Sequence, residues 1–251
     1  MTIGFGIFPE VPKQTINAAA ALFDGTNDYM KKASAIVAAY QKGICSFWFR
    51  QTGFSGDEVV FSAECTNAGD LALKCYFSVS LGGLVLLVVK SGTTDVYFGG
   101  IVTASVADGE WHHIVFAWDA SVPAYKVLFD GVLEVTAPIT GVFGGGVGAV
   151  PTKWTIGAQD SAAGKASMEI SEFYLTTNVY PDLALKSVQR KFISAHRRPV
   201  FLGSTGAKPT GTQAEIYLKG SGTGFNINSG SGGDFTTTGA LTAPTTTPSI
   251  P

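Results

Sequence analysis

Charged residues are scarce in this chain of 251 residues, at 14% of the total, and 17 Lys and Arg stand against 19 Asp and Glu. A charge this close to neutral provides no broad electrostatic surface for a phosphate backbone, so we expect no nucleic-acid partner. Hydrophobic residues make up 45% of the chain. This excludes disorder over the whole length, because disorder requires low hydrophobicity and high charge. So few charges also favour a surface that is partly covered by partners.

Long apolar runs are also missing. The longest one extends from Leu81 to Val89 and contains Gly82 and Gly83, whereas a membrane-spanning helix needs about 20 apolar residues. The first residues contain no basic segment followed by an apolar one, so we expect no secretory signal. The sequence therefore predicts no membrane insertion.

Cysteine is rare too, with Cys45, Cys65 and Cys75 as its three members. An odd number does not suit a disulfide framework. Buried thiols in a reducing compartment are the favoured interpretation. A bridge between Cys65 and Cys75 across a hairpin is the alternative.

Helical periodicity is nearly absent, and short β-type stretches recur along the chain instead. Clusters of Gly, Asn, Asp and Pro separate these stretches, which is typical of a β-sandwich or jelly roll and excludes a doubly wound α/β fold. The expected strands are Ala18–Phe23, Cys45–Arg50, Glu58–Ala63, Leu71–Val79, Leu84–Lys90, Val96–Phe98, His113–Trp118, Lys126–Phe129, Lys153–Ile156 and Ser167–Leu175.

Two segments show the strand pattern most clearly. Both faces of His113–Trp118 are largely apolar, which predicts a central strand covered on both sides. Asp130-Gly131 lies between two β-rich runs, and this dipeptide predicts a two-residue type I′ hairpin in which both residues have positive φ.

The chain is expected to divide into an N-terminal arm at 1–17, a sandwich domain at 18–198 and a C-terminal arm at 199–251. Within the sandwich domain a helix is expected near 181–195, because Pro181 suits a first helical turn and apolar residues recur there at spacings of three and four. The C-terminal arm is rich in Gly, Ser, Thr and Pro and contains one short strand.

We expect the C-terminal arm to lie along a neighbouring subunit or to dock back on the sandwich. A disordered tail is the alternative. The residues expected at an assembly contact are Ile216, Tyr217, Leu218, Phe225 and Phe235.

Three stretches together resemble the concanavalin A-like lectin/glucanase superfamily, in its laminin-G-like or pentraxin-like branch. They are Ala21–Tyr29; Asp108–Val115 with Asp119 and Phe129–Gly131; and Thr155–Ala158 with Met168–Leu175. The resemblance covers positions 18–195. It implies an all-β fold, a two-sheet antiparallel jelly-roll sandwich, with the helix capping its end.

The second stretch, Asp-Gly-Glu-Trp-His-His, is the most specific of the three. Trp111 follows a turn and is expected to plug the end of the sandwich. His112 and His113 are expected to point to opposite faces of one strand.

Catalytic motifs are not found, so we expect no enzyme. Enzymes of the resembled superfamily place acids two and four residues apart on one strand. Glu169 and Glu172 are three apart, and on a regular strand, short of a local bulge, they diverge. The sequence contains no G-x-S-x-G elbow, no zinc motif and no phosphate-binding loop.

Calcium is the one metal that the resemblance brings into consideration, since members of the family often bind it through loop oxygens. The candidate ligands are Asp24, Asn27, Asp28, Asp119 and Asp160. Oxygen ligands suit Ca²⁺, but these are also ordinary turn residues. No other cofactor is expected.

The C-terminal stretch from Phe201 to Thr242 resembles the tails of lectin-fold proteins encoded by tailed bacteriophages. It implies a non-enzymatic virion structural protein, a capsid decoration or tail-associated protein. Such a protein is assembled in the host cytoplasm with copies of itself and other virion proteins. Sheet edges and extended arms suit such contacts.

The alternative function is a carbohydrate-binding module or adhesin that recognises host-surface glycans. It would use exposed aromatic side chains at one rim of the sandwich, although aromatic residues of a β-sandwich more often lie in the core. The candidate ligand-binding residues are Tyr29, Tyr97, Trp154 and Tyr174.

Overall fold

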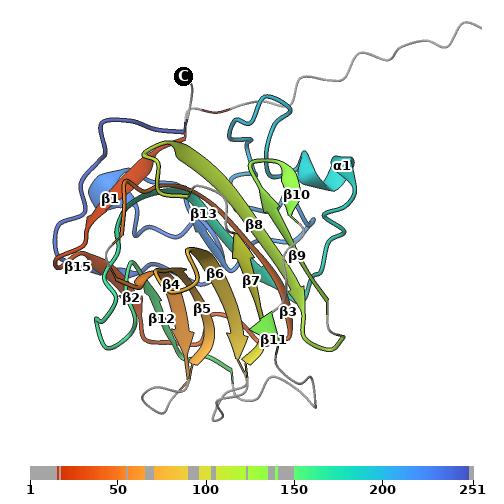
Figure 1. Ribbon diagram of the computed structural model, residues 1–251, viewed down its shortest axis with the longest axis horizontal. Helices are drawn as coiled ribbons and strands as arrows, with labels where there is room; N and C mark the ends of the chain where they lie inside the picture. Colours follow the sequence, from red (N-terminus) through yellow and green to blue (C-terminus); the bar gives the residue numbers. More distant parts are fainter. Residues whose placement is uncertain are drawn as a thin grey trace, which may run out of the picture.

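Two antiparallel sheets packed face to face form the computed structural model of this chain (Figure 1). The structure describes residues 16, 18–54, 56–65, 71–89, 96–102, 106–122, 124–134, 139–140 and 150–248, and for 87–89, 96–102 and 139–140 it describes the backbone alone. Apart from position 16, the predicted N-terminal arm lies outside these residues.

The first sheet has seven strands. In spatial order they are β1 (Ala20–Asp24), β13 (Ser167–Thr177), β3 (Lys42–Arg50), β8 (Trp111–Asp119), β9 (Ala124–Phe129) and β10 (Val132–Glu134), with β14 (Ile216–Leu218) also paired to β13. The second sheet has eight strands. They are β11 (Ile139–Thr140), β7 (Val96–Val102), β6 (Gly83–Val89), β5 (Leu71–Ser78), β4 (Glu58–Glu64), β12 (Lys153–Ile156), β2 (Tyr29–Lys32) and β15 (Thr236–Thr238).

The two-sheet antiparallel sandwich confirms the fold class that the sequence predicts, and every expected strand has an observed counterpart. The Asp130-Gly131 turn is also confirmed, because both residues have positive φ, at 47° and 77°, and Val132 pairs with Phe129. β8 lies between β3 and β9, with buried side chains on both of its faces. It is therefore the central strand that its two apolar faces predict.

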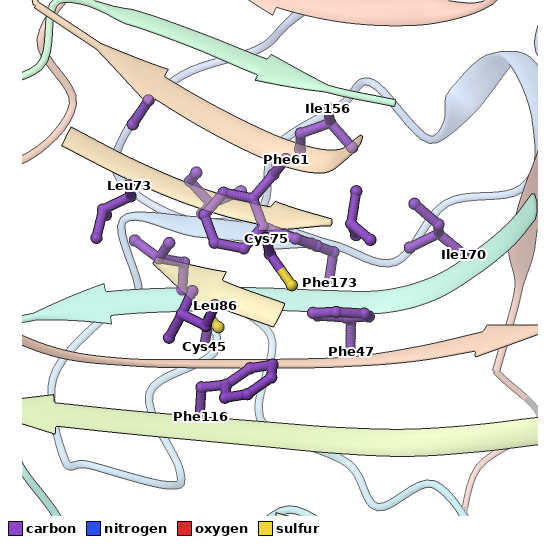
Figure 2. Close-up of a cluster of buried hydrophobic side chains, with 14 of the residues drawn as sticks. Cys45, Phe47, Phe61, Leu73, Cys75, Leu86, Phe116, Ile156, Ile170 and Phe173 are labelled. Carbon is purple, nitrogen blue, oxygen red and sulfur yellow. The ribbon is translucent and has the colours of Figure 1, made fainter. Parts of the chain in front are cut away.

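The main core fills the space between the sheets. Phe47 of β3 and Phe173 of β13 stack with their ring centroids 5.7 Å apart, and Phe61 of β4 meets Phe173 from the opposite sheet at 5.4 Å (Figure 2). Cys45 and Cys75 belong to the same layer, one from each sheet. All three cysteines are buried and none takes part in a disulfide. Buried thiols are therefore confirmed and the Cys65–Cys75 bridge is corrected, whereas the reducing compartment stays a prediction.

A second apolar cluster covers the outer face of the seven-stranded sheet, the face turned away from the other sheet. Ile44, Val115 and Leu128 point outward from β3, β8 and β9 and pack under Leu183 and Phe192. The segment carrying these last two residues is a series of turns around α1 (Lys186–Gln189), which has four residues.

The helix expected at 181–195 is thus much shorter than predicted, and it lies over the outer face beside β9 and β10 rather than at the end of the sandwich (Figure 1). The apolar spacing that suggested a helix over 181–195 is explained by contacts with the sheet below. In the part of the chain that the structure describes, no helix has the length and apolar character needed to cross a bilayer.

The C-terminal segment docks back on the sandwich and completes both sheets. β14 pairs with β13 in one sheet, and β15 pairs with β2 in the other. A short 3-10 helix, η1 (Gly222–Gly224), lies between them. Residues 199–248 therefore belong to the sandwich rather than to a separate arm.

The five residues expected at an assembly contact are all buried within their own chain. Phe225 and Phe235 lie in the core between the sheets, and the three residues of β14 are at most 1% exposed. The expectation of an assembly contact is corrected for these residues. The second alternative, docking back on the sandwich, describes them.

Candidate functional site: a pocket on the outer face

A pocket of about 410 Å³ opens on the outer face of the seven-stranded sheet. Trp48 and Arg50 of β3 line it together with Trp111 of β8. Arg197 and Thr246, which lies near the C-terminus, complete its wall. Four distant parts of the sequence thus meet at one site.

The alternation of side chains along β3 explains why these residues face outward. Phe47 and Phe49 enter the core between the sheets, so Trp48 and Arg50 must point to the other face. Trp111 is the cross-strand partner of Arg50, and directly paired side chains lie on the same face of a sheet. The register therefore places two tryptophans and an arginine side by side.

Hydrogen bonds hold the wall of the pocket in place. Arg50 Nη1 donates to Glu169 Oε1 at 2.8 Å, and Arg50 Nε donates to the carbonyl of Gly109 at 2.5 Å. Trp111 Nε1 donates to Thr246 Oγ1 at 3.2 Å, and this hydroxyl donates to Glu169 Oε2 at 3.4 Å. The C-terminal segment is thereby tied to the edge of the pocket.

Two exposed charged side chains at the pocket, Glu110 and Arg197, are not used in this way. Among the described residues, neither side chain has a hydrogen-bond or ion-pair partner. A carboxylate and a guanidinium without internal partners can donate and accept charge-assisted hydrogen bonds to a ligand.

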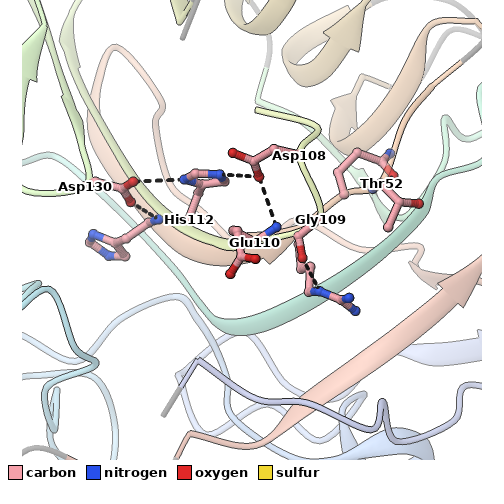
Figure 3. A network of polar contacts seen from close by, with 9 residues as sticks. Thr52, Asp108, Gly109, Glu110, His112 and Asp130 are labelled. Carbon is pink, nitrogen blue, oxygen red and sulfur yellow. Dashed lines mark hydrogen bonds and ion pairs between the residues drawn. The ribbon is translucent and has the colours of Figure 1, made fainter. Parts of the chain in front are cut away.

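A polar network lies directly behind the loop that presents Glu110 and Trp111 (Figure 3). His112 Nδ1 is 2.8 Å from Asp130 Oδ2, and His112 Nε2 is 3.0 Å from Asp108 Oδ1. Burial lowers the pKa of His112, but the hydrogen bonds and charges of the two carboxylates outweigh burial and raise the pKa above its usual value. His112, at the end of the Asp-Gly-Glu-Trp-His-His stretch, thus links the loop at Asp108 to the turn at Asp130.

His113 lies on the outer face of the sheet and packs against Trp48, which lines the pocket. Its Nε2 is 2.9 Å from Ser46 Oγ, and its ring centroid is 4.8 Å from that of Trp48. Burial lowers the pKa of His113 to about 3, so the ring is neutral at pH 7. Among the described residues, its buried Nδ1 has no hydrogen-bond partner, and this is the nitrogen that the carboxylate holds in a Ser-His-Asp triad.

The family model of the concanavalin A-like lectin/glucanases superfamily matches residues 24–177, more than half of the chain. The chain belongs to this superfamily. The match includes the Asp108–His113 stretch, so the family resemblance that the sequence suggested is confirmed.

Solved structures show the same fold for this concanavalin A-like chain. A Bacteroides ovatus protein described as a proposed carbohydrate-binding protein is 13% identical, with a TM-score of 0.60 over 94% of this chain and 63% of that one. A heptameric SAP-like pentraxin from Limulus polyphemus is 15% identical, with a TM-score of 0.56 over 90% and 94%. Domains LG4-5 of the mouse laminin alpha1 chain are 14% identical, with a TM-score of 0.48 over 65% and 43%.

This chain therefore spans less than half of the laminin fragment and slightly under two thirds of the Bacteroides protein. No curated protein sequence matches it. The likenesses with TM-scores of 0.60 and 0.56 establish the fold, and none of the three structures supplies a link to a bacteriophage.

The five candidate calcium ligands of this concanavalin A-like chain do not all meet at one place, although Asp24, Asn27 and Asp28 share one turn. Asp24 accepts hydrogen bonds from the backbone N–H groups of the turn after β1, and Asp28 accepts one from Ala240. Asp119 is paired with Lys42 at the opposite end of the seven-stranded sheet.

Asn27 lies in the same turn as Asp28, and Asp160 is paired with Lys31 and Lys153. No group of three or more His, Cys, Asp or Glu side chains suited to a metal occurs in the described parts of the chain. Backbone hydrogen bonds engage Asp24 and Asp28, and calcium binding at these residues stays a prediction.

The candidate ligand-binding aromatics lie away from the pocket or inside the protein. Trp154 is in the core between the sheets and Tyr174 in the outer cluster, so neither presents a ring face to a ligand, and the prediction is corrected for both. Tyr29 is half-buried on β2, and Lys31 Nζ lies 5.2 Å from its ring centroid. The side chain of Tyr97 lies outside the described residues.

Glu169 and Glu172 are separated by a β-bulge in β13. Ser171 pairs with Trp48 and Tyr174 pairs with Ser46, so two residues, Glu172 and Phe173, oppose one. Glu172 has a φ of 49°, and its carboxylate accepts a hydrogen bond from Tyr217 in the outer cluster. Both acids thus reach the outer face, which corrects the regular-strand alternation. Each is buried and held by its own partner, Arg50 for Glu169 and Tyr217 for Glu172.

The pocket residues Trp48, Arg50 and Arg197 were not predicted from the sequence, and Trp111 was expected to plug the end of the sandwich. A usable pattern exists in Phe47-Trp48-Phe49-Arg50. Alternation places the tryptophan and the arginine together, opposite two phenylalanines that suit the core. Arg197 and Thr246 have no such pattern, because only the tertiary fold brings them to β3.

Proposed function

We propose that this chain is a carbohydrate-binding module or adhesin and that it binds a glycan in the outer-face pocket. The observation that carries the proposal is the meeting of two tryptophans with an unpartnered carboxylate and an unpartnered guanidinium at one open pocket. Small-molecule sites combine aromatic walls with a few placed polar groups in this way. The description of the Bacteroides ovatus protein as a proposed carbohydrate-binding protein supports the same function.

The bound sugar would be held by two kinds of contact. The half-buried ring of Trp111 offers an apolar face with a polar edge fixed on Thr246, and a pyranose ring can stack on such a face. Glu110 and Arg197 would accept from and donate to sugar hydroxyls. Trp48, at 4% exposure, contributes mainly the floor beneath.

The proposal includes no catalysis. It is supported by the engagement of Glu169 with Arg50 and of Glu172 with Tyr217, which holds each carboxylate on a partner of its own. Binding without turnover is the activity expected of such a site.

A place in a bacteriophage virion, among copies of itself and other virion proteins, stays a prediction from the tail sequence. The buried position of Phe225 and Phe235 means that partners would have to meet the exposed surface instead. A virion adhesin for host-surface glycans combines this prediction with the proposed function.

Replacement of Trp111 by Ala should weaken binding to glycans about tenfold, because the stacking surface is removed. The measurement is a glycan array carrying host-surface and bacterial-surface sugars, followed by calorimetric titration of the best ligand. Tyr29→Ala is the matched control, since this aromatic lies on the other sheet and is one of the four ligand-binding residues expected from sequence. An array without bound glycans would overturn the function, and loss of binding in Tyr29→Ala alone would move the site.

A further inference from the structure

The contacts of His112 require a charged ring. Both ring nitrogens face carboxylate oxygens, Nδ1 towards Asp130 and Nε2 towards Asp108 (Figure 3). An ionised carboxylate only accepts hydrogen bonds, and a neutral imidazole has one N–H. The two contacts can therefore exist together only when His112 is an imidazolium. The pKa of Asp108 is lowered, first by the hydrogen bond from the Glu110 N–H and then by that from His112, so the proton belongs to the histidine.

The surroundings of the ring leave these two carboxylates as its charged neighbours. Phe129 of β9 stacks on one side at 5.0 Å between centroids, and Phe49 of β3 lies at 5.7 Å. His113, the next residue, points to the opposite face, and Arg50 on β3 is directed to Gly109 and Glu169. Among the described groups, Asp130 and Asp108 are the charges that act on His112.

Loss of the proton would break the contact with Asp108 rather than that with Asp130. Asp130 Oδ1 also accepts the backbone N–H of His113 at 2.8 Å, and its side chain is 18% exposed. The Asp108 side chain is 38% exposed, so water can replace His112 as its hydrogen-bond partner. A neutral His112 keeps one N–H, and the better-fixed partner retains it.

The loop that follows Asp108 forms one wall of the pocket, through Gly109, Glu110 and Trp111. Asp108 Oδ1 accepts the Glu110 N–H at 2.9 Å, and the neighbouring Gly109 carbonyl holds Arg50 Nε. The same loop presents Glu110 and leads into Trp111. A proton on His112 is therefore coupled to the shape of the pocket.

We propose that the charged form of His112 holds the pocket in its binding geometry and that ligand affinity falls when this histidine loses its proton at higher pH. The inference rests on the proposed function, because the ligand of the pocket is taken to be a glycan. Coupling of two sites through one element commonly changes affinity by about tenfold. We expect a loss of that size between about pH 5.5 and about pH 9.

We call this control of the pocket by the protonation of His112 the gate. Two independent readouts test it. The first is the indole N–H resonance of Trp111 in the ¹⁵N-labelled full chain, followed with the His112 ring resonances from about pH 5.5 to about pH 9. The second is the glycan array probed at both ends of this range. In the wild type, the Trp111 resonance should move with the same midpoint as His112, and the array signals should weaken towards high pH.

Three variants separate the gate from a general effect of pH. In Asp108→Asn the midpoint should fall by about one pH unit, because a negative charge beside the imidazolium is lost. In His112→Gln the transition of the Trp111 resonance should disappear. His196→Gln, which changes the exposed histidine outside the network, should leave the midpoint unchanged.

A Trp111 resonance that does not follow His112 would overturn the gate, as would an unmoved midpoint in Asp108→Asn. If glycans bind equally at both pH values while Trp111 stays still, the gate fails and the proposed function stands. If no glycan binds at any pH while Trp111 follows His112, the gate stands and the proposed function fails.

Discussion

Truncation of the chain after Arg198 is expected to abolish the folded state. The deleted segment supplies β14 and β15, one strand for each sheet. It also supplies eight large buried side chains, namely Val200, Leu202, Ile216, Tyr217, Leu218, Phe225, Phe235 and Leu241. Burial of that many side chains contributes more than about 10 kcal/mol, which is comparable with the whole stability of a typical domain. Far-UV circular dichroism and thermal denaturation would measure the loss.

The matched control for this truncation ends at Pro248 and keeps every contact that the structure describes. Phe225→Ala is the point variant, with an expected cost of about 3–5 kcal/mol in the free energy of unfolding. A chain ending at Arg198 that melts cooperatively like the wild type, and loses only self-association, would restore the assembly arm that the sequence suggested.

Stability should fall as the pH rises through neutrality because of Glu172. Burial raises the pKa of this carboxyl to about 7, although the hydrogen bond from Tyr217 and the charge of Lys219 oppose the rise. Its unfolded value is near 4.5. Between these pH values the folded state holds a proton that the unfolded state has released. The contribution is therefore full below about pH 4.5 and is lost as the pH passes through about 7, a change of about 3 kcal/mol.

Glu172→Gln should remove this dependence. A glutamine oxygen can accept the Tyr217 hydrogen bond without a charge. The free energy of unfolding of the variant should therefore exceed that of the wild type by up to about 3 kcal/mol at about pH 8 and match it near pH 4.5. Urea denaturation of both proteins across this range measures the difference, in which all other titrating groups cancel. Glu169→Gln is the control, and loss of its ion pair with Arg50 should destabilise at neutral pH. Equal pH profiles for Glu172→Gln and the wild type would contradict the assignment.

The strands and the tightest turn could be predicted because their causes are local. Alternation sets the two faces of β8, and Asp130-Gly131 takes up the positive φ angles that its hairpin requires. The Asp108–His113 stretch identified the superfamily from residues that the structure joins in one network.

The helix and the C-terminal segment were misjudged because their causes are not local. Leu183 and Phe192 are apolar because they cover the outer face of a sheet. The spacings of three and four between the apolar residues of this segment resemble those of a helix only by coincidence. The Gly- and Thr-rich stretch 199–248 has few apolar residues, yet most of the large ones, such as Phe225 and Phe235, are buried by strands distant in sequence. The bulge at Glu172 likewise depends on tertiary packing, since Tyr217 holds the displaced carboxylate.

The pocket could be predicted only in part. Trp48 and Arg50 share a face by alternation alone, and Trp111 joins them once the register of β3 and β8 is known. Arg197 and Thr246 lie in irregular segments, and no local sequence pattern predicts that they reach the pocket. The proposed glycan site is therefore a property of the assembled sandwich.

The central claim, that a glycan occupies this pocket, is tested most directly by the indole N–H resonances of the four tryptophans. Trp48 and Trp111 line the pocket, whereas Trp118 and Trp154 are buried in the core and serve as internal controls. On titration of an array-positive glycan into ¹⁵N-labelled protein, the resonances of Trp48 and Trp111 should move while those of Trp118 and Trp154 stay. Binding that leaves the Trp48 and Trp111 resonances unchanged would contradict the account.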